Sequence, residues 1–117
     1  MRFVRKGMVC GIYEYRVYRA KASEMPEPTD EGVTHIEDRK ILIREDLDKA
    51  RYGEVLQHEL RHAWWDASGL GAYFASVTKL SGKKLEEAEE IFIRMDTPAG
   101  LSTMKSFGLL RGRYTGT

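Results

Sequence analysis

Hydrophobic and polar residues alternate with a period of two over residues 8–19. This segment is rich in β-branched and aromatic side chains, and its alternation predicts a β-strand. The two faces of the strand carry different sets of residues, namely Ile12, Glu14, Arg16 and Tyr18 on one face and Tyr13, Tyr15 and Val17 on the other. A shorter strand over residues 2–5, ending at a turn at Lys6-Gly7, is compatible with the same pattern.

Two further strand-like runs, residues 33–37 and 40–44, flank the two-residue turn Asp38-Arg39. Apolar runs separated by so short a polar segment predict a β-hairpin. The preceding residues 22–32 contain two prolines, a glycine and several acidic residues. This composition is typical of a surface loop.

The pattern then changes to a helical period. Asp48 is a good N-cap, with Asp46 as a second candidate, and the helix is expected to end near Ser68, before Gly69. Steps of 100° per residue separate its faces. They place Tyr52, Leu56, Leu60 and Ala63 toward the core, Val55, His58, Glu59, His62 and Asp66 toward a cleft, and Arg61 and Trp64 away from both.

The segment from Leu70 to Leu80 is compatible with helix or strand. A second helix is predicted from about Lys83 to Asp96, and Thr97-Pro98 predicts the start of a short third helix that ends near residue 107. The residues after 110 are expected to be frayed. The apolar stripe of the second helix consists of Leu85, Ala88, Phe92 and Met95.

Composition bounds the class of protein. A chain of 117 residues suffices for one domain over residues 1–117, and 42% apolar with 32% charged residues is ordinary for a soluble globular protein. The net charge of +1 does not indicate nucleic acid or a membrane as partner. Basic residues concentrate in 1–23 and after Thr97, and acidic residues in 24–38. We expect these segments to pair in the fold, with a basic contact patch as the alternative.

Cys10 is the only cysteine, which excludes an internal disulfide and a cysteine-based zinc site. Its place in the strand pattern predicts a small buried residue. The first residues are too charged for a signal peptide, and no segment approaches the ~20 apolar residues of a membrane span. We therefore expect a cytoplasmic protein.

The motif His58-Glu59-Leu60-Arg61-His62 is the strongest chemical feature of the chain. Residues four apart on a helix share one face, so the two imidazoles can bind one Zn²⁺ while Glu59 points at its open position. The longer pattern HExxHxxGxxH is absent, because Trp65 and Ser68 stand where its glycine and last histidine would be.

A catalytic zinc usually has three protein ligands, so a third must be found. Among the glutamates of the second helix, Glu89 lies at the edge of the apolar stripe, where a carboxylate needs a compensating cation. Glu89 is the preferred ligand, and Glu86, Glu90 and Asp66 remain alternatives.

These motifs resemble a known family. The matching stretches are residues 32–43, Leu47-Asp48, 55–63 and 89–93, with Pro98 and Leu101 following. They resemble small zincins of the gluzincin arrangement, in which a glutamate from a later helix completes an HExxH site, and more narrowly short phage and prophage metallopeptidase-like proteins related to the ImmA/IrrE group. Where that group has an Ala-Asn pair after the glutamate, this chain has Glu90-Ile91.

The resemblance implies an α+β fold, with a curled antiparallel or mixed sheet packed on the HExxH helix and a second ligand-bearing helix. It also implies an edge strand along the substrate cleft, the zinc ligands His58, His62 and Glu89, and Glu59 as general base. Relatives in that group cleave transcriptional repressors. This substrate is not carried over, because the chain has no helix-turn-helix beside the zinc domain.

The site predicts zinc-dependent hydrolysis of a peptide bond in an intracellular protein or peptide, with Glu59 as general base and then general acid. Tyr73 and His35 are candidates for stabilising the oxyanion, and Asp66 for accepting the free ring N–H of His62. Trp65 is expected to pack near His58. The alternative function is a zinc-stabilised protein-binding module without turnover, for example a phage-encoded interactor of a host protein.

Overall fold

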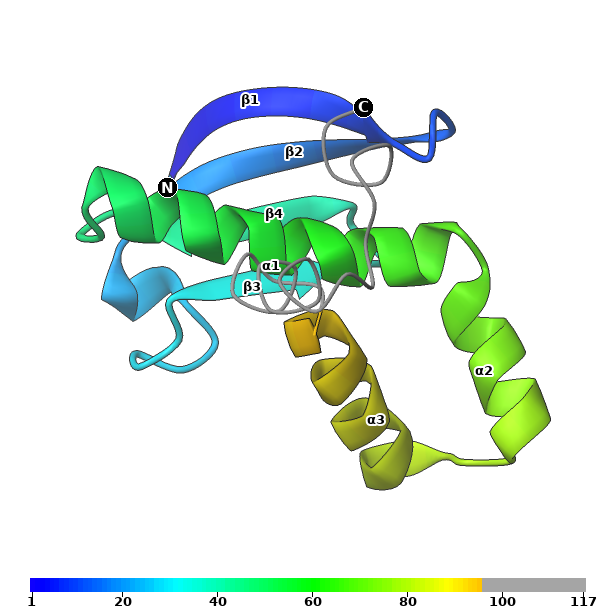
Figure 1. The fold of residues 1–117 in the computed structure, drawn as a ribbon. Coiled ribbons are helices and arrows are strands. Elements are labelled where there is room, and N and C mark those ends of the chain that lie inside the picture. Colours follow the sequence, from blue (N-terminus) through cyan, green and yellow to red (C-terminus); the bar gives the residue numbers. More distant parts are fainter. Residues whose placement is uncertain (96–117) are drawn as a thin grey trace, which may run out of the picture.

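The computed structural model describes residues 1–95, which form an α+β fold with a four-stranded mixed sheet and three helices. Figure 1 shows their arrangement. The predicted short helix after Thr97 and the frayed tail lie outside the described residues. In chain order the elements are β1 (Arg2–Val9), β2 (Tyr13–Ala20), a 3-10 turn (Ala22–Glu24), β3 (Gly32–His35), β4 (Lys40–Arg44), α1 (Lys49–Ala67), α2 (Leu70–Thr78) and α3 (Gly82–Met95).

The strand order in the sheet is β1-β2-β4-β3. β1 and β2 are antiparallel, β2 and β4 are parallel, and β3 and β4 are antiparallel. The predicted hairpin is confirmed, although its connection comprises four residues, 36–39, rather than two. β4 lies between β2 and β3, and β3 pairs with β4 alone, so β3 is an edge strand of the sheet.

The predicted strand over 8–19 is wrong in one respect, because a turn divides it. Cys10 and Gly11 both have positive φ angles, 56° and 67°, and the Ile12 N–H donates to the Val9 carbonyl at 3.2 Å. Positive φ at both central residues is what a tight hairpin turn requires. Lys6 and Gly7, predicted as a turn, therefore lie inside β1. Cys10 sits on the turn and is exposed, not buried as predicted.

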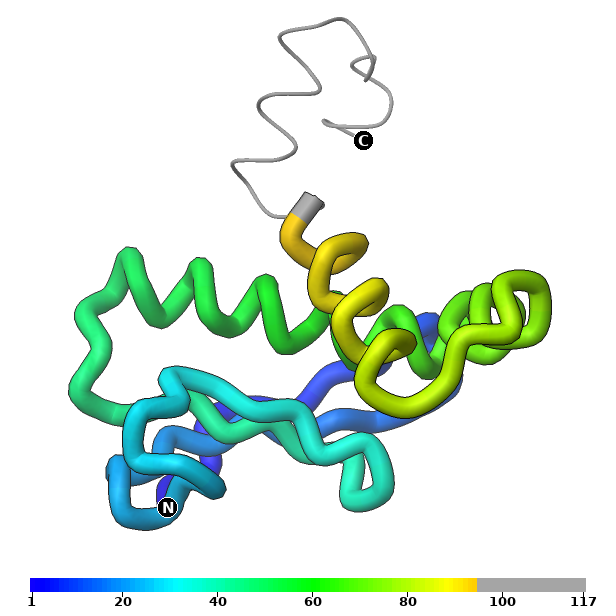
Figure 2. Tube along the Cα trace, turned by 90° about the horizontal axis from the view of Figure 1, so that it is seen from below, coloured from blue at the N-terminus to red at the C-terminus, as the bar shows by residue number. Residues whose placement is uncertain are grey.

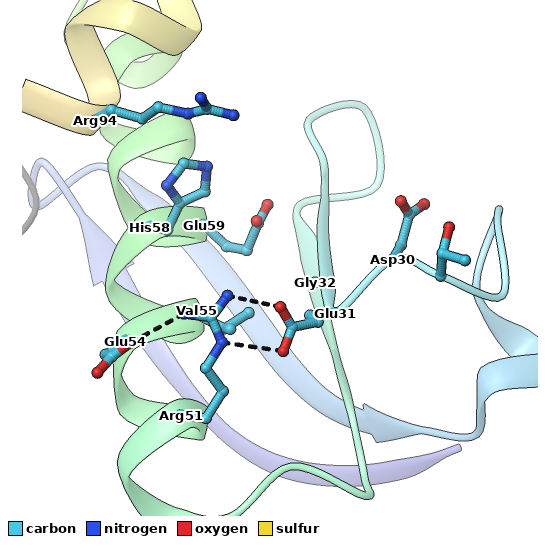
Figure 3. A pocket seen from close by; sticks show the side chains of 10 residues that line it. Asp30, Glu31, Gly32, Arg51, Glu54, Val55, His58, Glu59 and Arg94 are labelled. Carbon is cyan, nitrogen blue, oxygen red and sulfur yellow. Dashed lines mark hydrogen bonds and ion pairs between the residues drawn. The ribbon is translucent and has the colours of Figure 1, made fainter.

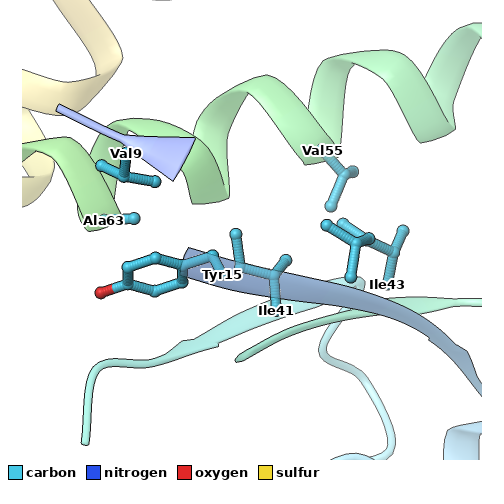
Figure 4. Packing of buried hydrophobic residues seen from close by; sticks show 7 residues of the cluster. Val9, Tyr15, Ile41, Ile43, Val55 and Ala63 are labelled. Carbon is cyan, nitrogen blue, oxygen red and sulfur yellow. The ribbon is translucent and has the colours of Figure 1, made fainter. Parts of the chain in front are cut away.

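The main core lies between α1 and one face of the sheet (Figure 4). Its buried members are Val9, Tyr15, Val17, Ile41, Ile43, Val55 and Ala63. On α1 the buried line runs through Val55, Glu59 and Ala63 at four-residue spacing. Leu60, predicted to face the core, is 37% exposed, because the helix is rotated so that Glu59 occupies the inward position. Tyr52 and Leu56 are half-buried against the same core, in agreement with prediction.

The ends of α1 agree with the sequence. The Asp48 carboxylate accepts a hydrogen bond from the Arg51 backbone N–H at 2.8 Å, which confirms it as the N-cap. Gly69, with φ of 79°, follows the C-cap Ser68 and turns the chain into α2. The segment from Leu70 to Leu80, ambiguous in the sequence, is helical from Leu70 to Thr78. No helix within residues 1–95 is long and apolar enough to cross a bilayer.

The chain leaves the end of α1 through α2 and returns along α3 toward the middle of α1 (Figures 1 and 2). The inward face of α3 differs from the predicted stripe. Ile93 is 1% exposed, whereas Phe92 is 43% exposed. The side chain of Met95, the last member of the predicted stripe, lies outside the described part of the structure.

Candidate metal centre

α1 presents His58 and His62 on one face, one turn apart, as their spacing predicts. Their ring centroids lie 5.0 Å apart with an interplanar angle of 75°. The two Nε2 atoms are 3.3 Å apart. Both side chains are half-buried, so the pair of nitrogen donors opens into the space between α1, α3 and the edge of the sheet.

α3 brings the carboxylate of Glu90 to the same place. Its Oε1 lies 2.7 Å from Nε2 of His62, and its Oε2 lies 3.5 Å from Nε2 of His58. One donor atom from each of the three residues falls within 4.8 Å of the others. Two imidazoles and one carboxylate therefore converge on a common point and could hold a metal ion.

Glu89, the ligand preferred from the sequence, contacts the other ring nitrogen of His62. Its Oε2 is 2.6 Å from Nδ1 of His62, on the side of the ring opposite to the three convergent donors. The difference follows from the rotation of α3. One residue corresponds to 100° on a helix, and burial of Ile93 in place of Phe92 turns Glu90 toward the histidine pair.

Glu59 is the buried member of the motif. Its side chain is 7% exposed, and Oε1 accepts a hydrogen bond from the Thr34 hydroxyl at 2.8 Å. Burial raises the pKa of Glu59, against smaller opposing effects from the Thr34 hydrogen bond and the neighbouring histidines. The structure thus adds Thr34 to the site, a residue that the sequence analysis missed although it lies in a predicted strand.

Gly32 allows β3 to approach α1 this closely. A Cβ at this position would lie 2.5 Å from Cγ1 of Val55 and 3.0 Å from Cγ of Glu59. Ordinary carbon contacts lie at ~3.5–4.0 Å, so there is no room for a side chain. Composition predicted a surface loop over residues 22–32, which is wrong for Gly32 because it begins β3. Its contact partners belong to a helix more than twenty residues later, so no local pattern indicates this constraint.

The pKa of His62 reflects the carboxylates around it. Burial lowers this pKa, but the hydrogen bond with Glu89 and the charges of Glu59, Glu90 and Glu89 together outweigh burial and raise it. The arrangement is thus one in which negative groups surround a histidine and favour positive charge at its ring.

The remaining predicted candidates do not meet at this point. Thr34 and Ile36 line a cavity beside the convergent donors. His35, which lies between them in the sequence, does not line it. Tyr73 lies exposed on α2. Asp66 is exposed, and its charge acts instead on the Tyr15 phenol, whose pKa is raised by burial first and by Asp66 second.

Three predictions for neighbouring side chains have different outcomes. Glu86, one of the alternative ligands, is exposed on α3 and is not part of the convergent group. Trp65 is buried, but it packs on Phe92 and Phe74, with ring centroids 4.8 and 5.7 Å away, rather than near His58. Trp64 is partly exposed on the outward side of α1, as predicted.

Two cavities flank the convergent donors. One, of about 400 Å³, is lined by Thr34 and Ile36 and by the histidines and glutamates of the centre. The other, of about 680 Å³, continues past His58 and Glu59 (Figure 3). The residues that line both are Asp30, Gly32, His58 and Glu59. The two cavities adjoin one another at these four residues, and together they are referred to as the groove.

Comparisons with known proteins find no relative: no family model, no curated protein and no solved structure matches this chain. The roles of the site residues therefore rest on their geometry and chemistry.

Proposed function

We propose that this protein is a zinc-dependent metallopeptidase that hydrolyses a peptide bond in a protein or peptide. The observation that carries the proposal is the convergence of His58, His62 and Glu90 beside a buried carboxylate, Glu59, that is not part of the convergent group. A purely structural zinc site has no need of such a carboxylate.

The donor set fits zinc. Imidazole nitrogen and carboxylate oxygen are both ordinary zinc ligands, and ligands bonded at 2.0–2.1 Å in a tetrahedron lie roughly 3.3–3.4 Å apart. The Nε2 atoms of His58 and His62 are 3.3 Å apart, and Glu90 Oε2 is 3.5 Å from Nε2 of His58. The contact between Glu90 Oε1 and His62, 2.7 Å, has the length of a hydrogen bond. Three donors would thus hold the ion and leave a position open for water.

A zinc ion in such a site supplies a Lewis acid and lowers the pKa of a bound water toward 7. The side chains of the protein supply the proton transfers. Glu59 takes a proton from the attacking water and passes it to the departing amine. The Thr34 hydroxyl holds the Glu59 carboxylate by a 2.8 Å hydrogen bond. Glu89 accepts the Nδ1–H of His62, so that Nε2 keeps its lone pair for the metal.

The edge strand β3 offers a place for the substrate backbone. Within the described sheet it pairs with β4 alone, so its outer edge is available for an extended peptide. Three residues of β3, Gly32, Val33 and Thr34, line the smaller cavity together with the convergent donors. A sheet with an edge strand along the groove, packed on the HExxH helix, is the arrangement expected of a small zincin of the gluzincin type, and we extend the proposal to that class and to the likeness with the ImmA/IrrE group.

The metal content and one substitution test the proposal. Purified protein should contain about one zinc per chain, and Glu59→Gln should keep the zinc while losing cleavage of a peptide library by at least 100-fold. If the wild-type protein takes up no zinc, the proposed metal site is refuted. Cleavage that survives unchanged in Glu59→Gln would refute the role of Glu59.

The zinc-stabilised binding module without turnover remains the second candidate, because the same three ligands join α1 to α3. Zinc removal should lower the unfolding temperature under both proposals, so this measurement does not distinguish them. Glu59→Gln separates the two, because a binding module keeps its biological effect in this variant and a peptidase loses it.

A further inference from the structure

The larger cavity extends the groove away from the candidate metal centre. Its volume is about 680 Å³, within the range of ~300–1,000 Å³ that is usual for small-ligand sites. Its walls come from the loop at 29–31, from α1 and from Arg94 at the end of α3, as Figure 3 shows. A side chain that enters it from the groove passes directly beside Glu59.

The cavity is lined by more negative than positive groups. The lining residues include four with carboxylates, Asp30, Glu31, Glu54 and Glu59, and two with guanidinium groups, Arg51 and Arg94. Without Glu59, three carboxylates remain against two guanidinium groups, so the side chains that line the cavity have an excess of negative charge.

The charge of Arg51 is already satisfied. Its Nη2 and Nε donate to the two oxygens of Glu31 at 2.6 and 3.0 Å, and its Nη1 donates to Glu54 at 2.9 Å. A bidentate pair of this kind is among the stronger hydrogen-bonded contacts. Arg94 lies with Nε 3.5 Å from a carboxylate oxygen of Glu90. Both guanidinium groups therefore have carboxylate neighbours.

Asp30 differs from the other carboxylates. Its side chain has no hydrogen bond or ion pair with any other residue of the described range 1–95, and it is half-buried. It is also one of the four residues that line both cavities. A carboxylate in that position can receive a cationic group from the substrate without breaking a contact within the protein.

We propose that the larger cavity binds a lysine or arginine side chain of the substrate next to the cleaved bond, and that Asp30 selects for its positive charge. The place of cleavage rests on the proposed function, whereas binding of the cationic side chain does not require turnover. A charge-assisted hydrogen bond at a half-buried carboxylate should favour a cationic over an isosteric neutral side chain by about tenfold.

A binding experiment tests the cavity alone. The probes are Nα-acetyl-arginine amide, Nα-acetyl-lysine amide and the neutral Nα-acetyl-norleucine amide, titrated into the full chain and followed by backbone amide NMR shifts. The two cationic probes should shift the signals of Asp30, Gly32 and Glu59. Their dissociation constants, taken from these shifts, should be at least tenfold lower than that of the norleucine probe. Asp30→Asn should remove this preference, and Asp38→Asn, in the exposed β3–β4 turn, should keep it. Equal binding of all three probes, or a preference that persists in Asp30→Asn, overturns the inference.

A cleavage experiment separates the two proposals. A proteome digested after acidic residues retains internal lysine and arginine, and its cleavage sites can be profiled by mass spectrometry. We expect a basic residue beside the cut, with an enrichment that Asp30→Asn lowers about tenfold. Cleavage without that enrichment overturns the inference and leaves the peptidase proposal intact. Selective binding of the cationic probes without any cleavage upholds the cavity and refutes the peptidase.

Discussion

Replacing Gly32 with alanine tests the close approach of β3 to α1, on which the position of Glu59 depends. The added Cβ would lie 2.5 Å from Cγ1 of Val55, at least 1 Å inside the ~3.5 Å of an ordinary carbon contact. Val55 is buried and branched, so it cannot move aside without disturbing the core. Overpacking of this kind costs about 1–3 kcal/mol in the free energy of unfolding.

The assay is urea unfolding of the metal-free protein, followed by tryptophan fluorescence. In a thermal unfolding experiment, the same loss of unfolding free energy would lower the melting temperature of a chain of this length by about 4–12 °C. Gly7→Ala is the matched control, because a Cβ at Gly7 meets nothing within 4 Å and its φ is not in the left-handed region. The control should therefore change stability by less than about 1 kcal/mol.

A double substitution identifies the cause. Val55→Ala removes the atom with which the new methyl group collides, so Gly32→Ala should cost at least ~0.5 kcal/mol less in that background than in the wild type. If Gly32→Ala is as stable as Gly7→Ala, or if the two substitutions are additive, the close approach is not a constraint and this reasoning is wrong.

Two further predictions concern charged groups. Zinc affinity, measured by competition with a chelator, should fall more in Glu90→Gln than in Glu89→Gln. Glu89→Gln should lower the affinity about tenfold, because it acts only through the ring of His62, and the exposed Glu86→Gln should leave it unchanged. Equal losses of affinity in the three variants would contradict the proposed roles. The hydrogen bond from Arg51 lowers the pKa of Glu31, so Arg51→Gln should raise that pKa toward its ordinary value in a ¹³C NMR titration. A carboxyl group whose pKa is lowered in the folded state stabilises the fold above its unfolded pKa, and this stabilisation is lost as pH falls through the folded pKa. The difference in stability between the wild type and Arg51→Gln should therefore shrink on acidification. A difference that stays constant with pH would contradict the assignment.

Local patterns predicted much of the fold. The hairpin of β3 and β4, the N-cap Asp48 and the end of α1 at Ser68 all agree with the sequence. These features depend on residues close in sequence, through turn chemistry and the helical period. The spacing of His58 and His62 belongs to the same kind, since any helix places residues four apart on one face.

Features that depend on contacts between distant segments were predicted less well. The alternation over 8–19 continues through the turn at Cys10 and Gly11, because both strands of a hairpin present alternate residues to the same core. Periodicity alone therefore could not divide them. The choice of inward residues on α1 failed at Leu60 for a related reason: apolar character suggested burial, but the helix buries Glu59 instead.

By itself, the sequence determined that two imidazoles and one carboxylate lie close together on α1, because the helix period alone brings residues 58, 59 and 62 near one another. Only the tertiary structure decided what surrounds them. A rotation of one residue in α3 exchanges Glu89 and Glu90, and the sequence holds no local information on that rotation, which burial of Ile93 settles. In the same way, the hydrogen bond from Thr34 to Glu59 exists because packing brings an edge strand against a helix 25 residues away.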